Sequence, residues 1–181
     1  GLQFSTALQD HKAPLVFNIA GTGAAYDSAK MIEMQDLLYH AGFHVINISS
    51  PTYLDFQLSA STSHTPGYAP DDARDIYRVM QQAYDMVEDD IEVSAFHITG
   101  YSLGAMHAAF IADIDQREKK FNIQRVYMIS PPVNLYNSAI ILDELADNDI
   151  PSINGVPQMG SFLDHIISEL AKDYKPEQGM R

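Results

Sequence analysis

Gly100-Tyr101-Ser102-Leu103-Gly104 has the pattern Gly-x-Ser-x-Gly, and its surroundings decide the predicted fold. The apolar run Val93–Thr99 before it is typical of a buried strand, and the alanine-rich run Leu103–Asp115 after it is typical of a helix. A strand that turns directly into a helix leaves no space for side chains at the positions of the two glycines. The sequence therefore predicts that Ser102 stands on a sharp turn at the edge of a sheet, at the positive end of a helix dipole.

Alternating strand-like and helix-like runs extend this prediction to most of the chain. Helical patterns cover Asp27–Ala41, a run beginning at Pro70, and the run after Ser102. The predicted strands are Pro14–Ala20, Phe43–Ser49, Val93–Thr99 and Arg125–Ser130. This alternation favours an α/β fold with a mostly parallel sheet and helices on both faces. No fifth strand is predicted.

The remaining segments lack this alternation. Ser50–Ala69 is a long connection without predicted helix or strand, which indicates either an active-site wall or a mobile surface excursion. After Pro131-Pro132, a short helix is predicted over Ser138–Asp147 and a loop over Asn148–Gly160. A last helix would begin with Ser161 as its cap.

Composition excludes several classes of function. The 181 residues carry 24 acidic and 11 basic side chains, a net charge of −13 that disfavours nucleic acid as a partner. The absence of cysteine excludes disulfides, thiolate metal sites and a cysteine nucleophile. No apolar run approaches membrane-spanning length, and no histidine spacing indicates a metal site, so neither a membrane span, a metal nor a cofactor is expected. Compartment and oligomeric state do not follow from the sequence.

A serine nucleophile needs two N–H donors for the negative oxygen that forms during acyl transfer. One is expected from the backbone of Leu103, directly after the serine. The loop after the first predicted strand, Ala20–Ala25, is rich in small residues and indicates Thr22 as the second donor, with Gly23 as the next choice. A dinucleotide-binding loop is the alternative, but position 26 is Tyr26 where that pattern requires a third glycine.

With these features the chain resembles the α/β-hydrolases of the esterase and lipase type, in particular uncharacterised bacterial hydrolase-like proteins. The resemblance covers about the first 135 residues, and its motifs are Ala20-Gly21-Thr22-Gly23 and the pentapeptide around Ser102. It implies that the pentapeptide is a nucleophile elbow, with Gly100 and Gly104 as its glycines. It also implies an incomplete sheet made of the superfamily's third to sixth strands, and hydrolysis of an ester or thioester of a small-molecule acyl substrate.

The resemblance also implies a catalytic acid and a histidine that follow the serine along the chain. His107 lies on the helix of the elbow and His165 lies within a predicted helix, so neither has the expected position. The carboxylates after the serine do not follow a strand: Asp143, Asp147, Asp149 and Asp164.

The expected organisation is therefore a hydrolase core over residues 1–136 and a helical, cap-like segment over residues 137–181, the start of an insertion. The triad acid and histidine are expected beyond Arg181, which would leave this fragment inactive. Two alternatives stay open: a rearranged site that uses His165 or His64, and a non-catalytic binding or scaffold protein on a hydrolase fold.

Overall fold

A five-stranded sheet organises the first part of the chain in the computed structural model, which describes residues 3–149, 152–153 and 156–157. The chain divides into two compact units, Gly1–Pro132 and Val133–Arg181, and the sheet belongs to the first. Its strands are β1 (Phe4–Ala7), β2 (Ala13–Ile19), β3 (His44–Ile48), β4 (Val93–Tyr101) and β5 (Arg125–Ile129). Their order across the sheet is β1-β3-β2-β4-β5, and only β1 is antiparallel to its neighbour.

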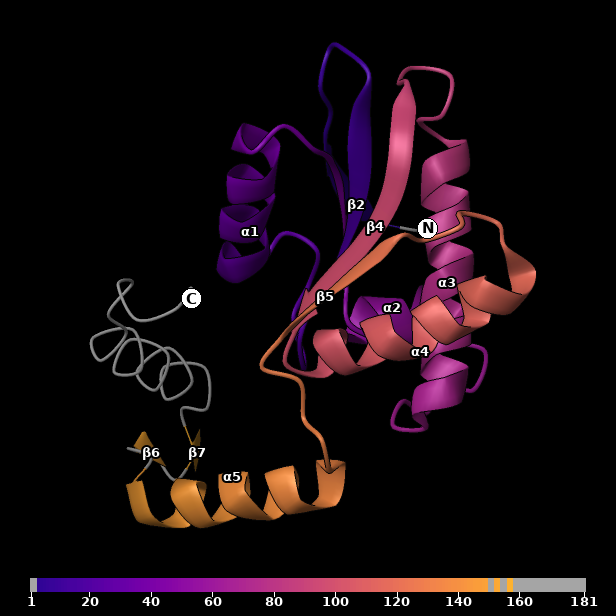
Figure 1. The fold of residues 1–181 in the computed structure, drawn as a ribbon. Coiled ribbons are helices and arrows are strands. Elements are labelled where there is room, and N and C mark those ends of the chain that lie inside the picture. The colour runs from indigo at the N-terminus through magenta and orange to yellow at the C-terminus, as the bar shows by residue number, and fades with distance from the viewer. Residues whose placement is uncertain (1–2, 150–151, 154–155, 158–181) are drawn as a thin grey trace, which may run out of the picture. The chain divides into compact units, whose positions relative to one another are not determined.

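Helices cover both faces of this sheet, as Figure 1 shows. Helix α1 (Ala29–His40) packs on β2 and β3, and α3 (Ala69–Asp85) packs on α4 (Leu103–Glu118) on the other face. The central strands are mostly apolar because both faces are covered, and β3 is buried along its whole length. The buried polar side chains of Asn18 and Asn47 on β2 and β3 hydrogen-bond to each other at 2.9 Å. The predicted α/β fold with a mostly parallel sheet is confirmed.

The core between the sheet and the α3–α4 pair is rich in aromatic rings. Phe17 of β2 packs against Phe121 with ring centroids 4.8 Å apart, and Tyr77 of α3 meets the same ring edge-on. Asp115 of α4 is buried beside them and accepts hydrogen bonds from the Tyr77 hydroxyl and from two backbone N–H groups of the α4–β5 connection. This carboxylate fixes the end of α4 relative to β5.

Three predictions about the elements are wrong. A fifth strand exists: β1 has only four residues, too few for its pattern to stand out, and it forms by pairing with β3. The connection Ser50–Ala69 contains helix α2 (Leu54–Ser59), which buries Phe56. In the second unit, α5 (Leu135–Asp149) is followed by the small hairpin of β6 (Ser152–Ile153) and β7 (Val156–Pro157), where a loop was expected. The helix predicted after Ser161 lies outside the described residues.

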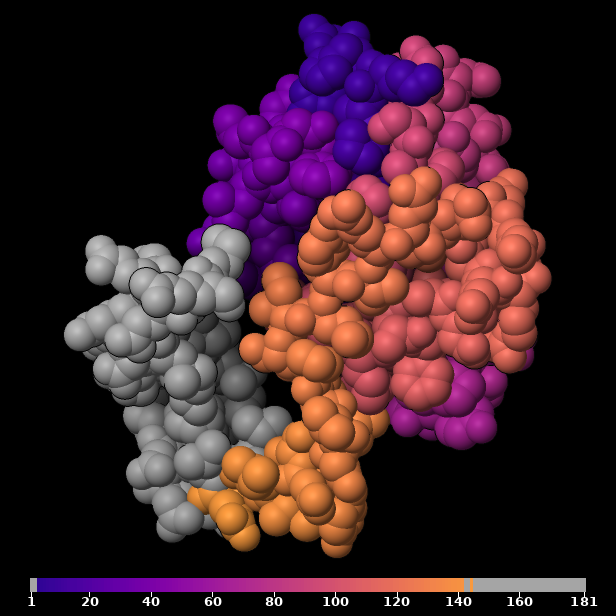
Figure 2. All heavy atoms as spheres, in the orientation of Figure 1, coloured from indigo at the N-terminus to yellow at the C-terminus, as the bar shows by residue number. Residues whose placement is uncertain are grey.

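Strand β5 is the last strand of the sheet among the described residues, and it pairs with β4 alone. Its side chains are largely exposed, including Tyr127, Met128 and Ile129. In the space-filling view, the orange atoms of this part of the chain lie at the surface (Figure 2). None of the helices in the described part of the chain is both long and apolar enough to cross a membrane.

Candidate active site

Ser102 stands between the last residue of β4 and the first residue of α4, in a backbone conformation that side-chain-bearing residues rarely adopt. Its φ is 52° and its ψ is −124°, so the turn holds the serine in a strained conformation. The Ser102 N–H donates to the carbonyl of Ile129 at 2.9 Å, and the Ser102 carbonyl accepts from the N–H of Ala105 at 3.0 Å. The side chain is partly exposed. These contacts hold the turn at both ends and leave the hydroxyl within reach of a ligand.

The two glycines of the pentapeptide are needed because backbone atoms fill the space beside them. A Cβ atom on Gly100 would lie 2.5 Å from the backbone of Gly104. A Cβ atom on Gly104 would overlap the carbonyl oxygen of Ile19 and lie 2.6 Å from that of Ala20. The contact of Gly100 with Gly104 is the close approach that the sequence predicts, and the first turn of α4 packs in addition directly against the end of β2.

The turn lies where the sheet reverses its winding order. The chain leaves β2 toward β3 on one side, and later returns to β4 on the other side of β2. In open α/β sheets, ligands bind in the crevice at the carboxyl ends of two such strands. Ile19 of β2 pairs with Gly100 of β4, so the loop after β2 begins beside Ser102.

The loop after β2 approaches the elbow through Gly21. A Cβ atom on Gly21 would lie 2.6 Å from the ring of Tyr101, the residue before the serine. Thr22 follows and is exposed. The N–H of Gly23, the second of the two expected donors, already donates to the side-chain oxygen of Thr52 at 2.7 Å.

His107 of α4 is buried in the interior, beside Asp72 of α3. Its side chain is 1% exposed, and burial lowers its pKa from 6.5 to about 4. Its Nε2 lies 3.8 Å from a carboxylate oxygen of Asp72 on α3, too far for a hydrogen bond, and burial raises the pKa of Asp72 as well. His107 is therefore neutral and packed, as its place on the helix of the elbow suggests.

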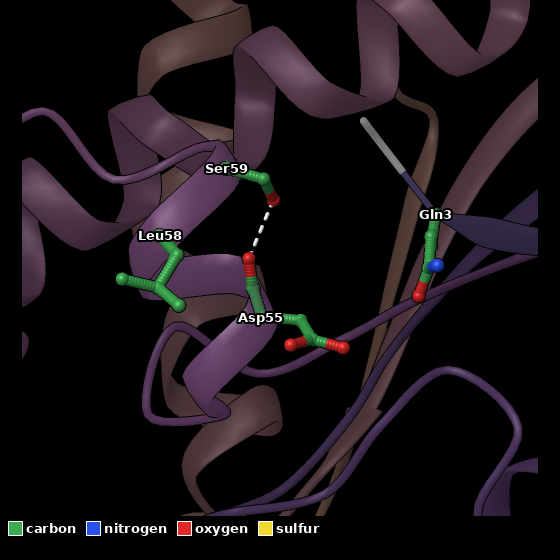
Figure 3. A pocket seen from close by; sticks show the side chains of 4 residues that line it. All are labelled: Gln3, Asp55, Leu58 and Ser59. Carbon is green, nitrogen blue, oxygen red and sulfur yellow. Dashed lines mark hydrogen bonds between the residues drawn. The ribbon is translucent and has the colours of Figure 1, made fainter.

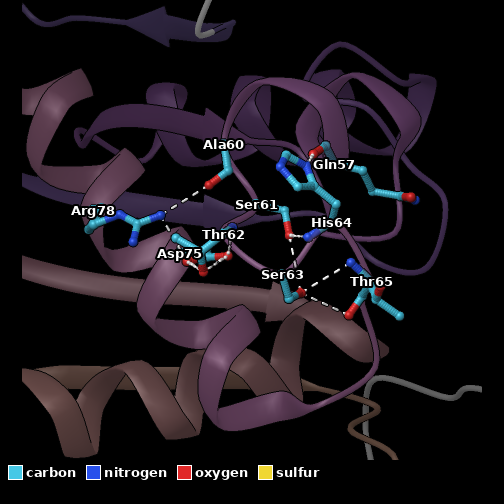
Figure 4. Close-up of polar contacts among 9 residues, drawn as sticks. All are labelled: Gln57, Ala60, Ser61, Thr62, Ser63, His64, Thr65, Asp75 and Arg78. Carbon is cyan, nitrogen blue, oxygen red and sulfur yellow. Dashed lines mark hydrogen bonds and ion pairs between the residues drawn. The ribbon is translucent and has the colours of Figure 1, made fainter.

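His64 lies in the turn that follows α2, and its ring bonds within that segment. The ring Nδ1 of His64 lies 2.9 Å from the carbonyl oxygen of Gln57, and the backbone N–H of His64 donates to the Ser61 hydroxyl (Figure 4). The segment is held to α3 by Asp75, a buried carboxylate that accepts from both the backbone and the hydroxyl of Thr62. Within the part of the chain that the structure describes, no histidine forms a hydrogen bond with the Ser102 hydroxyl. His165 and Asp164 lie outside the described residues.

A hollow of about 470 Å³ lies at another point of the same sheet edge. Asp55, Leu58 and Ser59 of α2 line it, with Gln3 from the chain before β1 on the opposite side (Figure 3). Because β1 and β3 lie on the far side of β2 from β4, the hollow is separate from the elbow. Among the described residues no cluster of histidine, aspartate and glutamate could hold a metal ion.

The sequence did not indicate Ser49, Ser50 and Thr52 after β3, although each of these residues hydrogen-bonds to the loop after β2, Ser50 through its backbone N–H and the other two through their hydroxyls. Ser49 accepts from the N–H of Tyr26, and Ser50 and Thr52 share a hydrogen bond of 2.8 Å. The run Ser49-Ser50-Pro51-Thr52 directly after a predicted strand is a signal that could have identified them.

Several solved structures are similar to this chain in fold. Est1E from Butyrivibrio proteoclasticus, solved with ferulic acid, has a TM-score of 0.55 at 15% identity over 86% of this chain and 55% of its own. A probable hydrolytic enzyme from Pseudomonas aeruginosa PAO1 has a TM-score of 0.55 at 15% identity over 96% of this chain and 51% of its own. Brefeldin A esterase, described as a bacterial homologue of human hormone sensitive lipase, has a TM-score of 0.52 at 17% identity over 81% of this chain and 46% of its own.

The chain thus has the α/β-hydrolase fold, shared with solved esterases and hydrolytic enzymes. It spans about half the length of these structures. No protein-family model matches the chain, and a search of curated proteins found no match.

Proposed function

We propose that this protein is a serine hydrolase of carboxylic ester or thioester bonds, with Ser102 as its nucleophile. The observation that carries the proposal is the backbone of Ser102, held at a φ of 52° on a strand-to-helix turn where the winding of the sheet reverses. The proteins of like fold, among them Est1E solved with ferulic acid and brefeldin A esterase, support a small-molecule acyl substrate.

In the proposed reaction, the Ser102 oxygen attacks the carbonyl carbon of the substrate and forms a tetrahedral intermediate. The N–H groups of Leu103 and Thr22 stabilise its negative oxygen, aided by the positive end of α4. A histidine takes the proton of the serine and passes it to the leaving alcohol or thiol, while a carboxylate orients the ring. Water then releases the acyl group by the same steps.

Residues 1–181 alone are expected to react slowly, because the described histidines do not reach the Ser102 hydroxyl. The test is therefore made on the protein encoded by the entire natural reading frame, with the 181-residue chain beside it. We expect a fluorophosphonate probe to label the entire protein at Ser102, and Ser102→Ala to abolish both labelling and hydrolysis of short-chain esters.

The absence of labelling would overturn the proposal. If the entire protein is not labelled under conditions that label a control esterase, the enzyme hypothesis is wrong. In that case the elbow has a structural role, as in a binding or scaffold protein.

A further inference from the structure

We propose that Thr52 is a positioning residue for the oxyanion loop of this enzyme, here defined as Gly21–Ala24. The inference rests on the proposed function, since the loop has a role in catalysis only if Ser102 is the nucleophile. The contact that supports the inference directly is the hydrogen bond of 2.7 Å from the Gly23 N–H to the Thr52 side-chain oxygen.

The oxyanion loop is a single tight turn. The Ala24 N–H donates to the Gly21 carbonyl at 3.1 Å, and Gly23, in the third position, has a φ of 69°. A positive φ at that position is typical of a type II turn, which differs from a type I turn in the direction of the peptide group between its two central residues. That group carries the Gly23 N–H. The bond to Thr52 therefore selects one orientation of the turn in which Thr22 lies.

Thr52 is itself held in place from the end of β3. Its hydroxyl shares a bond of 2.8 Å with the Ser50 hydroxyl, and its N–H donates to the same oxygen at 3.3 Å. Ser50 is fully buried, and its own N–H donates to the Ala24 carbonyl at 3.0 Å. Because a rigid strand supports these groups, the loop is fixed before any substrate binds.

The bracing comes from the side of the loop that lies opposite the nucleophile. β3 and β4 flank β2 on its two sides, so Thr52 holds the loop from one side while Gly21 packs against Tyr101 on the other. A donor held between two fixed surfaces needs no reorganisation when negative charge develops. Thr52 thus acts through the loop, without contact to the reacting atoms.

The test is Thr52→Val, which keeps the shape of the side chain and removes its hydroxyl. In the entire natural protein we expect kcat and the rate of fluorophosphonate labelling to fall about 10- to 100-fold, with KM nearly unchanged. Thr52→Ser should restore both rates to within about 2-fold of the wild type, because it keeps the acceptor. Amide hydrogen exchange should become faster at Gly23 in Thr52→Val and return to normal in Thr52→Ser.

Thr65→Val is the matched control, since Thr65 lies in the exposed turn after α2 and the same substitution there should leave both rates unchanged. If Thr52→Val unfolds at a much lower temperature than the wild type, Ser50→Ala is the variant to test instead. It removes the hydroxyl that holds Thr52, and we expect it to slow fluorophosphonate labelling about 3-fold or more.

The outcomes separate the two proposals. Wild-type labelling at Ser102 with unchanged kcat and labelling rate in Thr52→Val overturns the positioning role alone. Absence of labelling in the wild type overturns the proposed function and the positioning role together.

Discussion

Gly104 is the single residue at which the elbow tolerates least change. We expect Gly104→Ala to destabilise the first unit by about 2 kcal/mol or more, because the new methyl group meets the carbonyl oxygens of Ile19, the last residue of β2, and of Ala20 after it, and these cannot move without disturbing the pairing of β2. Urea denaturation measures this loss, and labelling of Ser102 in the entire protein should fall with it.

Gly42→Ala is the control for the cost of glycine replacement itself. Gly42 has a φ of 93° with no atom within 4 Å of a Cβ position, so only backbone strain, about 1–2 kcal/mol, should appear. Labelling of Ser102 should then be retained. An equal stability loss in the two variants, with labelling intact in both, would contradict the close packing of α4 on β2.

At the level of the elements, the buried carboxylate of Asp115 holds the end of α4 through three hydrogen bonds. We expect Asp115→Ala to lower the free energy of unfolding by about 3 kcal/mol or more, because the Tyr77 hydroxyl and two backbone N–H groups lose their acceptor. Burial raises the pKa of Tyr77, and the hydrogen bond to Asp115 raises it further, so the tyrosine stays protonated and can donate.

Asp113→Ala on the same helix is the matched control. Asp113 is exposed and pairs with Arg117 one turn away, so its loss should cost less than about 0.5 kcal/mol. Urea denaturation of both variants gives the comparison, and similar costs would show that the Asp115 bonds contribute little to stability.

For the whole molecule, His107 makes stability depend on pH. Its pKa is about 4 in the folded protein and 6.5 when exposed, so between these values the unfolded chain binds the extra proton. Stability is therefore fully present above pH 6.5 and falls by about 3 kcal/mol as the pH drops to 4. Asp72 acts in the opposite sense, because its pKa is raised above 3.8 and folding favours its protonated form at low pH.

His107→Gln should flatten this dependence between pH 6.5 and 4, which urea denaturation at several pH values measures directly. Asp72 is the charged group that faces His107 from α3, so Asp72→Asn is measured beside it. A wild-type stability that stays constant from pH 6.5 to 4 would show that His107 is not buried in its neutral form.

Much of this molecule follows from local sequence. Short apolar runs that alternate with helical patterns predict β2, β3, β4, β5 and the helices between them, because a strand covered on both faces is mostly apolar. The turn at Ser102 also follows from local sequence, because only glycines fit beside it. In contrast, β1 is too short to have a pattern and forms only because β3 offers an open edge.

The candidate site divides in the same way. The pentapeptide by itself determined where the serine stands, and the small residues after β2 determined which loop faces it. Only the tertiary structure decided that Gly23 is bound by Thr52, that Thr22 remains exposed, and that His107 is buried beside Asp72. The physical reason is that these facts depend on contacts between segments distant in the chain. The hydrogen bond between Gly23 and Thr52, which are 29 residues apart, produces no periodic pattern of residue types from which it could be predicted.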